Sequence, residues 1–258
     1  MTNNKIESQF FDSQEIAAFK QQGFLVVRQM YNPAQMAQIT AWVDELQSLP
    51  EVPGQYMMYF EDSLNQPDKR ILSRIENFCP YHEGLNNLIN GEAMLQQVSE
   101  LFGEPAILFK EKVNFKMPGS NGFTPHQDAQ AGWNSYASLF ITVLITIDQC
   151  TPENGCLELA AGHNQGLIGE LWQPLTAENM QGMEFIPIET EPGDVIFFDS
   201  YAPHRSAPNL TKSPRRVLYV TYNRSGEGDF RCQYYADKRQ SYPPDIERQP
   251  GKDYVFKV

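Results

Sequence analysis

Residues 110–128 read Lys110-Glu-Lys-Val-Asn-Phe-Lys-Met-Pro-Gly-Ser-Asn-Gly-Phe-Thr-Pro-His126-Gln-Asp128, and they combine a strand pattern with candidate metal ligands. A strand-like run, Ile107 to Phe115, leads into a turn-rich loop at residues 117–124. The loop delivers a histidine and a carboxylate two residues apart. On extended backbone, residues i and i+2 point to the same side. We therefore expect the side chains of His126 and Asp128 to converge on one ion.

Two ligands do not make a stable metal site, so a third is expected elsewhere in the chain. The best candidate is His204, which follows a second strand-like run, Asp194 to Asp199. Two histidines and one carboxylate on one face of an ion, with the other positions open, are typical of non-haem Fe(II) oxygenases. Catalytic zinc sites accept the same ligand types, so a zinc hydrolase is a competing enzyme class. A non-catalytic binding module of the cupin type is a third class, which loss of one ligand would mark.

Polar side chains alternate with other residues along the first strand-like run. The polar set is Lys110, Lys112, Asn114 and Lys116. A period of two places all four on one face of a strand. That face is either an ordinary solvent-facing surface or the polar lining of a barrel that receives an anionic ligand, and the pattern leaves both open.

Two arginines, Arg215 and Arg216, stand at the head of a third strand-like run, residues 217–222. Strand alternation lets only one of them face inward. An arginine inside a barrel is an expensive buried charge unless an anion meets it. Its planar fork suits a carboxylate. We expect Arg216 to be the surface residue of the pair.

Composition narrows the class of protein. The chain has 258 residues, 41% of them hydrophobic, and a net charge of −12. This acidity argues against nucleic acid as a partner, because phosphate binding needs a basic face. The polar N-terminus and the lack of a long apolar run argue against a signal peptide and a membrane span. Four scattered cysteines favour reduced thiols in a cytoplasmic protein, although Cys150 and Cys156 flank a turn and could approach each other.

Local patterns predict helices mainly before residue 104 and strands after it. Helices are expected from Asp12 to Gly23, from Asn32 onward and over residues 93–102, because capping residues and helical spacing coincide there. Short β-rich runs alternate with Pro, Gly and Asn turns from residue 104, as in a sandwich, jelly roll or barrel. We expect one domain over residues 1–258, with a helical and strand N-terminal part (1–103), a jelly-roll core (104–224) and an irregular C-terminal tail (225–258).

Five segments in order resemble the phytanoyl-CoA dioxygenase family of Fe(II)/2-oxoglutarate oxygenases. They are His126-Gln-Asp128, Asn154-Gly-Cys-Leu157, Ala161-Gly-His163, Pro192-Gly-Asp-Val-Ile-Phe-Phe198, and His204-Arg-Ser-Ala-Pro-Asn209 with Arg215. The resemblance implies a mainly β fold, a double-stranded β-helix (jelly-roll) core with N-terminal helices packed against it. It also implies Fe(II) held by His126, Asp128 and His204, with 2-oxoglutarate and O2 as cosubstrates.

Further roles follow from the same resemblance. Arg215 matches the partner of the distal carboxylate of 2-oxoglutarate, and Ser206 matches a residue that hydrogen-bonds that carboxylate. Lys116, Asn114 and Arg74 match positions near the cosubstrate in some members. A hydrolase has no need for such a buried dicarboxylate anchor, so this set favours the oxygenase. Halogenating relatives lack the carboxylate ligand, so the intact Asp128 favours hydroxylation.

The C-terminal stretch is similar to bacterial members that hydroxylate small aminophosphonates, such as 2-aminoethylphosphonate or its N-trimethylated form. This resemblance implies hydroxylation of the carbon next to phosphorus. The phosphonate would be met by Lys110 and Lys112 from the strand and by Arg231 or Arg239 from the tail. Carboxylates and aromatic faces of the tail, among them Asp237 and Tyr234, would meet the amino end. The alternative is the same chemistry on another small metabolite.

Overall fold

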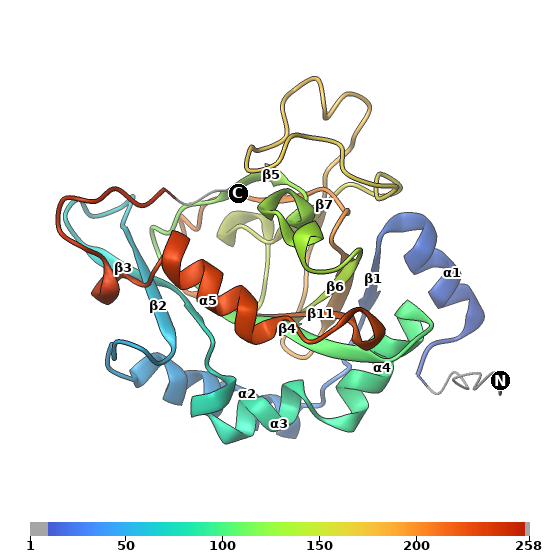
Figure 1. Cartoon of the computed structure of the whole chain (residues 1–258), viewed down its shortest axis with the longest axis horizontal. Coiled ribbons are helices and arrows are strands. Elements are labelled where there is room, and N and C mark those ends of the chain that lie inside the picture. Colours follow the sequence, from blue (N-terminus) through green and yellow to red (C-terminus); the bar gives the residue numbers. More distant parts are fainter. Residues whose placement is uncertain (1–9, 256–258) are drawn as a thin grey trace.

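The computed structural model describes residues 10–255, which form two antiparallel β-sheets with helices packed around them (Figure 1). The large sheet has the strand order β1 (Phe24–Val27), β9 (Val195–Asp199), β6 (Phe140–Thr146), β11 (Arg215–Arg224), β4 (Ala106–Lys116), β3 (Arg70–Glu76) and β2 (Met57–Asp62). The small sheet has the order β5 (Phe123–His126), β10 (His204–Ser206), β7 (Leu157–Leu159) and β8 (Ile186–Ile188). Residues of β4 and β11 line the same inner cavity as residues of β5, β7 and β10, so the sheets face each other. This is the jelly-roll arrangement that the turn spacing and the resemblance predict.

Helices cover the outer face of the large sheet. They are α1 (Ser13–Gln22), α2 (Pro33–Ser48), α3 (Glu83–Ile89) and α4 (Glu92–Phe102). Asp12 and Asn32 form capping boxes with Glu15 and Gln35, and Gly23 ends α1 at a φ of 86°. These ends agree with the helix signals in the sequence.

One apolar face of α2 packs against the large sheet. Its residues Met36, Ile39, Val43 and Leu46 belong to the same buried cluster as Val113 and Phe115 of β4. Each such side chain contributes roughly 1.5–3 kcal/mol of burial free energy. Because Val113 and Phe115 face these helices, the alternate residues of β4 must face the other way, into the space between the sheets.

The polar face of β4 therefore lines the interior and is not a solvent surface. Lys110, Asn114 and Lys116 are all buried. The sequence leaves two interpretations of this face open, a solvent-facing surface and a barrel lining. The structure shows the barrel lining. β4 pairs with β11 along its length, and this pairing sets Arg215 directly opposite Lys116.

The C-terminal tail corrects one expectation, because it contains a helix where an irregular segment is predicted. α5 (Arg231–Ser241) lies across β4 (Figure 1) and buries Tyr234 and Tyr235. Pro243 and Pro244 follow the helix and do not interrupt it. Two buried tyrosines give this otherwise polar segment enough packing to order it.

Local sequence patterns do not predict several of the short elements. These are α3, β5, β10 and the 3-10 turns at Cys79–Tyr81, Asp128–Ala131, Trp133–Ser135, Pro152–Asn154, Ser225–Glu227 and Asp245–Glu247. All four cysteines are free, Cys150 and Cys156 included. Within residues 10–255, the structure contains no helix with the length and apolar character required to cross a bilayer.

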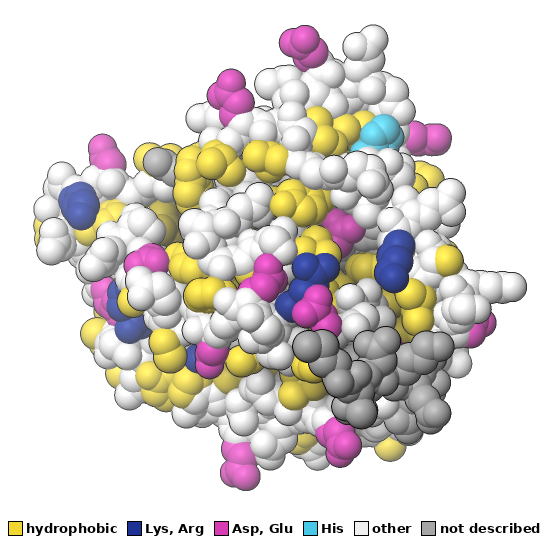
Figure 2. Space-filling model, turned by 45° about the vertical axis from the view of Figure 1, so that its right-hand side comes forward, with side chains coloured by type: hydrophobic (Ala, Val, Ile, Leu, Met, Phe, Trp, Pro, Cys, Tyr) yellow, Lys and Arg dark blue, Asp and Glu magenta, His cyan; other side chains and the backbone are white. Residues whose placement is uncertain are grey.

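Surface charge follows the acidic composition. On the face shown in Figure 2, acidic side chains are scattered, and the basic side chains form small separate groups, several of them beside acidic ones. Four basic residues that bear on the candidate site are instead buried, namely Arg74, Lys110, Lys116 and Arg215.

Candidate active site

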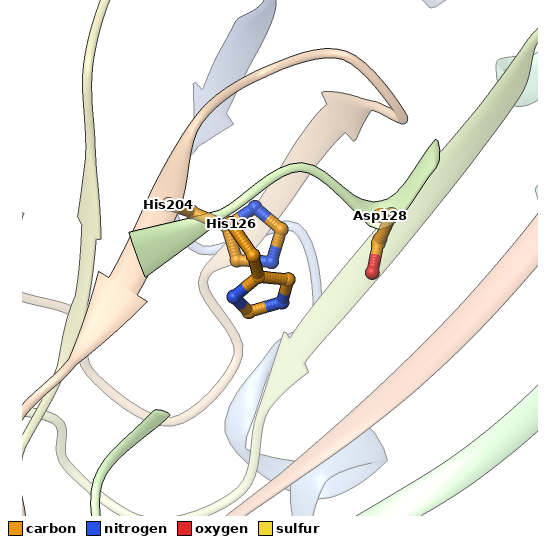
Figure 3. A group of neighbouring side chains, drawn as sticks. All are labelled: His126, Asp128 and His204. Carbon is orange, nitrogen blue, oxygen red and sulfur yellow. The ribbon is translucent and has the colours of Figure 1, made fainter. Parts of the chain in front are cut away.

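His126, Asp128 and His204 come together at one end of the small sheet (Figure 3). One ligand atom from each lies within 4.8 Å of the others, close enough to bind a single ion. His126 ends β5 and His204 begins β10, and the two are direct antiparallel partners. Asp128 begins the 3-10 turn after β5. The i, i+2 spacing therefore brings the two side chains to one side, as the sequence predicts.

Hydrogen bonds orient both imidazoles. The Nδ1 of His126 lies 2.7 Å from the Thr124 carbonyl oxygen, and the Nδ1 of His204 lies 3.0 Å from the Ala202 carbonyl oxygen. A carbonyl only accepts, so each Nδ1 donates and each Nε2 lone pair is left for a metal. Burial lowers the pKa of His126 to about 3 and also lowers the pKa of His204. Both rings are therefore neutral, which is the form that binds metal.

The carboxylate ligand is ionised and supported. Burial alone would raise the pKa of Asp128, but the positive charges that face it, those of Lys110 and Lys112 among them, hold it below its ordinary value. The Thr142 hydroxyl donates to Asp128 Oδ2 at 3.3 Å. Two neutral imidazoles and one carboxylate suit Fe(II), and they leave the remaining positions of the ion open.

Two buried glutamines next to Asp128 fix its turn. The backbone N–H of Gln127 donates to Gln130 Oε1 at 2.8 Å. Gln127 Nε2 donates to the carbonyls of Gly166 and Tyr201. The Gly166 contact ties the ligand turn to the long segment between β7 and β8, which projects at the top of Figure 1, and the Tyr201 contact ties it to the turn between β9 and β10. Sequence reasoning missed both residues, since a glutamine carries no signal of burial.

A second cluster lies between β4, β10 and β11. Arg215 is 1% exposed, and within residues 10–255 its Nε and Nη1 have no hydrogen-bond partner. Lys116 Nζ donates to Ser206 Oγ at 2.8 Å. A buried guanidinium with unpaired N–H groups is costly unless an anion meets it. The cluster therefore fits the distal carboxylate of 2-oxoglutarate, and Arg215 presents the fork that such a carboxylate requires.

Arg216 points the other way, as strand alternation requires. It pairs with Asp148 at 2.8 Å and with Asp44. Asn114 and Ser206 line the small inner cavity beside the metal ligands. Asn114 Oδ1 has no hydrogen-bond partner in the described part of the chain.

A cavity of about 570 Å³ opens beside the metal ligands. Its wall includes Arg74, Glu76, Lys110, Lys112, His126, Asp128, Trp133, Tyr136, Trp172, Tyr234, Asp237, Lys238 and Tyr242. This volume is enough for a small polar substrate. Both candidate substrate lysines of β4 lie in this wall.

Some cations of the cavity wall pair with a carboxylate and others do not. Glu76 is buried and accepts hydrogen bonds from Arg74 at 2.7 Å and from Lys238 at 2.6 Å. Burial lowers the pKa of Lys238 to about 8 despite this partner. Lys110 Nζ lies 4.1 Å from the centre of the Trp133 ring and donates a hydrogen bond to the Tyr234 hydroxyl at 3.4 Å. Neither contact is a carboxylate.

Lys112 likewise forms no ion pair with a carboxylate of residues 10–255. Its Nζ lies 4.9 Å from the centre of the Tyr219 ring, and it makes no hydrogen bond within the part of the chain described. Burial lowers the pKa of Lys110 and that of Lys112. An anion in the cavity would reverse these shifts, because it would stabilise both charged forms.

The two tail arginines lie elsewhere. Arg231 pairs with buried Glu111 at 2.6 Å, and Arg239 pairs with Glu247 at 3.2 Å. Neither belongs to the cavity wall, so the expectation that they close it from the tail is not supported by their positions. The tail instead contributes Lys238, one turn from Tyr234 on α5. Glu76, Trp133, Tyr136, Trp172 and Lys238 are wall residues that sequence reasoning did not identify.

Comparison with known proteins agrees with this geometry. The family model described as phytanoyl-CoA dioxygenase (PhyH) matches residues 19–217. A 2-aminoethylphosphonate dioxygenase from uncultured bacterium HF130_AEPn_1 is 40% identical over 251 residues, covering 95% of this chain and 94% of that protein. A methylphosphonate hydroxylase from Gimesia maris is 38% identical over 233 residues, covering 90% and 87%.

Solved structures share the fold. The crystal structure of EctD from S. alaskensis with 2-oxoglutarate and 5-hydroxyectoine superposes with a TM-score of 0.74, at 19% identity. The match covers 88% of this chain and 79% of that one. Taken with the His-x-Asp and distal histidine ligands, these comparisons identify the chain as a member of the phytanoyl-CoA dioxygenase family and as an Fe(II)/2-oxoglutarate-dependent dioxygenase.

Proposed function

We propose that this dioxygenase hydroxylates the carbon next to phosphorus in a small zwitterionic phosphonate, 2-aminoethylphosphonate or its trimethylammonio analogue. One observation carries the proposal: Lys110 and Lys112 are cations of the cavity wall, beside the metal ligands, and within residues 10–255 neither forms an ion pair with a carboxylate. The names of two relatives, a 2-aminoethylphosphonate dioxygenase and a methylphosphonate hydroxylase, support it.

The charge balance favours a dianion. Glu76 already serves Arg74 and Lys238, and Asp128 would be taken up by the metal. Arg74 and Lys238 exceed Glu76 by one positive charge, and Lys110 and Lys112 add two more to the wall. A phosphonate dianion would compensate both, and its three oxygens accept hydrogen bonds from several donors at once. A monocarboxylate would compensate only one.

This chain's residues divide between three tasks. His126, Asp128 and His204 would hold Fe(II), with both imidazoles fixed in the tautomer that exposes Nε2. Arg215 would bind the distal carboxylate of 2-oxoglutarate, with Ser206, Lys116 and Asn114 around the cosubstrate. Arg74, which the resemblance places near the cosubstrate, donates a hydrogen bond to Glu76 in the cavity wall. When bound, iron and cosubstrate supply the oxidation: one oxygen atom of O2 enters the substrate C–H bond, and the other leaves in succinate, with release of CO2.

The wall also orients the substrate. With the phosphonate at Lys110 and Lys112, the adjacent carbon would lie nearer the metal ligands than the amino end would. Tyr136 and Asp237, which belong to the same cavity wall, offer an aromatic face and a carboxylate to an ammonium group. A cytoplasmic location is part of the same proposal, supported by four free cysteines.

The test is substrate-dependent formation of succinate by the Fe(II)-loaded enzyme. 2-Aminoethylphosphonate, its trimethyl analogue and methylphosphonate would be compared with carboxylates of the same chain length. We expect the phosphonates to accelerate 2-oxoglutarate turnover above the substrate-free rate and the carboxylates to fail. Acceleration by a carboxylate or another metabolite alone would refute the phosphonate assignment and leave the dioxygenase assignment intact.

A further inference from the structure

Trp172 is held in an unusual conformation at the mouth of the cavity. Its backbone φ is +66°, in the left-handed region that a bulky residue seldom adopts. Its side chain is 45% exposed, yet it forms part of the cavity wall. Strain of this kind persists only where the surrounding structure enforces it, and it marks positions under functional constraint.

The constraint comes from the turn that carries Asp128. The N–H of Trp172 donates to the Gln130 carbonyl at 2.8 Å. The Gln130 side chain donates to the carbonyls of Glu170 at 2.9 Å and Gln173 at 2.6 Å. Gln130 is fully buried and lies two residues past Asp128. The backbone on both sides of Trp172 is therefore fastened to the metal-ligand turn.

The indole of Trp172 packs against Gly132, where the missing side chain leaves room for the ring. A Cβ at Gly132 would lie 2.4 Å from Trp172 Cζ2, and Gly132 has a φ of +75°. Any larger residue there would displace the ring. Gly132 thus lets the indole lie against the first of the two 3-10 turns that follow Asp128.

The cavity wall that includes Trp172 also contains an aromatic side chain hydrogen-bonded to a carboxylate. Tyr136 donates its hydroxyl to Asp237 Oδ2 at 2.6 Å, and both residues share the wall with Trp172. Aromatic faces beside a carboxylate suit an ammonium or trimethylammonium group. Lys110 and Lys112, at the inner end, suit the anionic end of the same molecule.

We infer that Trp172 is a specificity-determining residue that recognises the cationic end of the substrate. The inference rests on the proposed phosphonate function and adds to it the residue that separates aminoalkyl phosphonates from phosphonates without an amino group. A methyl group in place of the aminoethyl chain would leave the indole without a cation to contact.

Trp172→Ala and Trp172→Phe are the test variants, and Leu171→Ala is the matched control. Leu171 is the adjacent residue, is 46% exposed and does not belong to the cavity wall. For each variant, KM and kcat would be measured with 2-aminoethylphosphonate, its trimethyl analogue and methylphosphonate. Binding to the Fe(II)- and 2-oxoglutarate-loaded protein without O2 would be followed by calorimetry, which gives a readout apart from turnover.

We expect Trp172→Ala to raise KM and Kd about tenfold for the two cationic phosphonates and less than about twofold for methylphosphonate. Trp172→Phe should restore part of the loss, and Leu171→Ala should match the wild type. An equal change for all three substrates, or no change, overturns the inference while the phosphonate function stands. Absence of turnover with every phosphonate in the wild-type enzyme overturns the proposed function, and the inference falls with it.

Discussion

His126 and His204 are direct partners across the β5–β10 pair, and their ring centres lie 4.2 Å apart. Two strands of four and three residues thus bring together ligands that are far apart in the chain. Antiparallel partners have Cβ atoms about 5 Å apart, which suits two ligands of one ion. A register shift of one residue would turn one ring to the other face of the sheet.

Loss of any metal ligand should abolish turnover. His126→Ala, Asp128→Ala and His204→Ala each leave two ligands, too few to retain Fe(II) in an open site. Equilibrium dialysis with Fe(II) and succinate formation would measure the two effects. His163→Ala, a histidine in the turn after β7, is the control and should keep both. Retained activity in His204→Ala would sink the assignment of the three ligands.

Arg215→Lys should raise the apparent KM for 2-oxoglutarate by about ten- to a hundredfold, because lysine keeps the charge and loses the bidentate fork. Arg216→Lys is the matched control. Its partners are Asp148 and Asp44 at the surface, so it should leave that KM unchanged. Steady-state kinetics with varied 2-oxoglutarate would decide. A larger effect from Arg216→Lys would reverse the assignment.

Lys112→Met should weaken binding of the phosphonate. The substitution keeps the volume of the side chain and removes one of the two cations that lack a carboxylate partner. One charge-assisted hydrogen bond corresponds to about a ten- to hundredfold rise in KM. Lys212→Met, at an exposed position, should have no effect. If KM for the phosphonate is the same in both variants, Lys112 does not contact it.

Glu76→Gln should destabilise the fold by about 3–5 kcal/mol, because Arg74 and Lys238 would keep their charges in a buried wall without the carboxylate. Glu51→Gln removes a carboxylate from the partly exposed pair with Arg70 and should cost under about 1 kcal/mol. Urea unfolding of both variants would give the two free energies. Similar values would mean that Glu76 is not the counter-charge of this cluster.

Asp199 should give the stability a distinct pH dependence. Burial raises its pKa from 3.8 to about 6, although Asn164 donates a hydrogen bond to it. Between those two values the folded state binds the proton more tightly than the unfolded state, so this group's contribution falls as pH rises from about 4 to 6.

Asp199→Asn removes that contribution. Relative to the wild type, the variant should gain on the order of 2–3 kcal/mol between pH 4 and pH 6.5, with no further change above about pH 7. Urea unfolding at several pH values would measure the difference. Parallel stability curves for the two proteins would show that Asp199 does not titrate in this range.

Local sequence rules predict the elements that carry strong signals. The capping boxes at Asp12 and Asn32 and the alternation of β4 all hold in the structure. The same rules miss β5 and β10, because strands of three or four residues hold too few side chains to show a period. They also miss α5, whose order depends on burying Tyr234 and Tyr235 against residues far away in sequence.

Residue types and their spacing are enough to predict the chemistry: the types of metal ligand, the common side of His126 and Asp128, and the single polar face of β4. These follow from residue type and a period of two, which are local properties. Which cations face the cavity depends instead on long-range packing. Arg231 forms an ion pair with Glu111 and lies outside the cavity wall. Lys238, seven residues later on the same helix, forms an ion pair with Glu76 and lies in the wall. The composition of the tail favours neither outcome. Whether a cation of the tail lies in the wall depends on which buried carboxylate it can reach. The register of the sheet and the packing of α5 set the distances between these cations and the carboxylates.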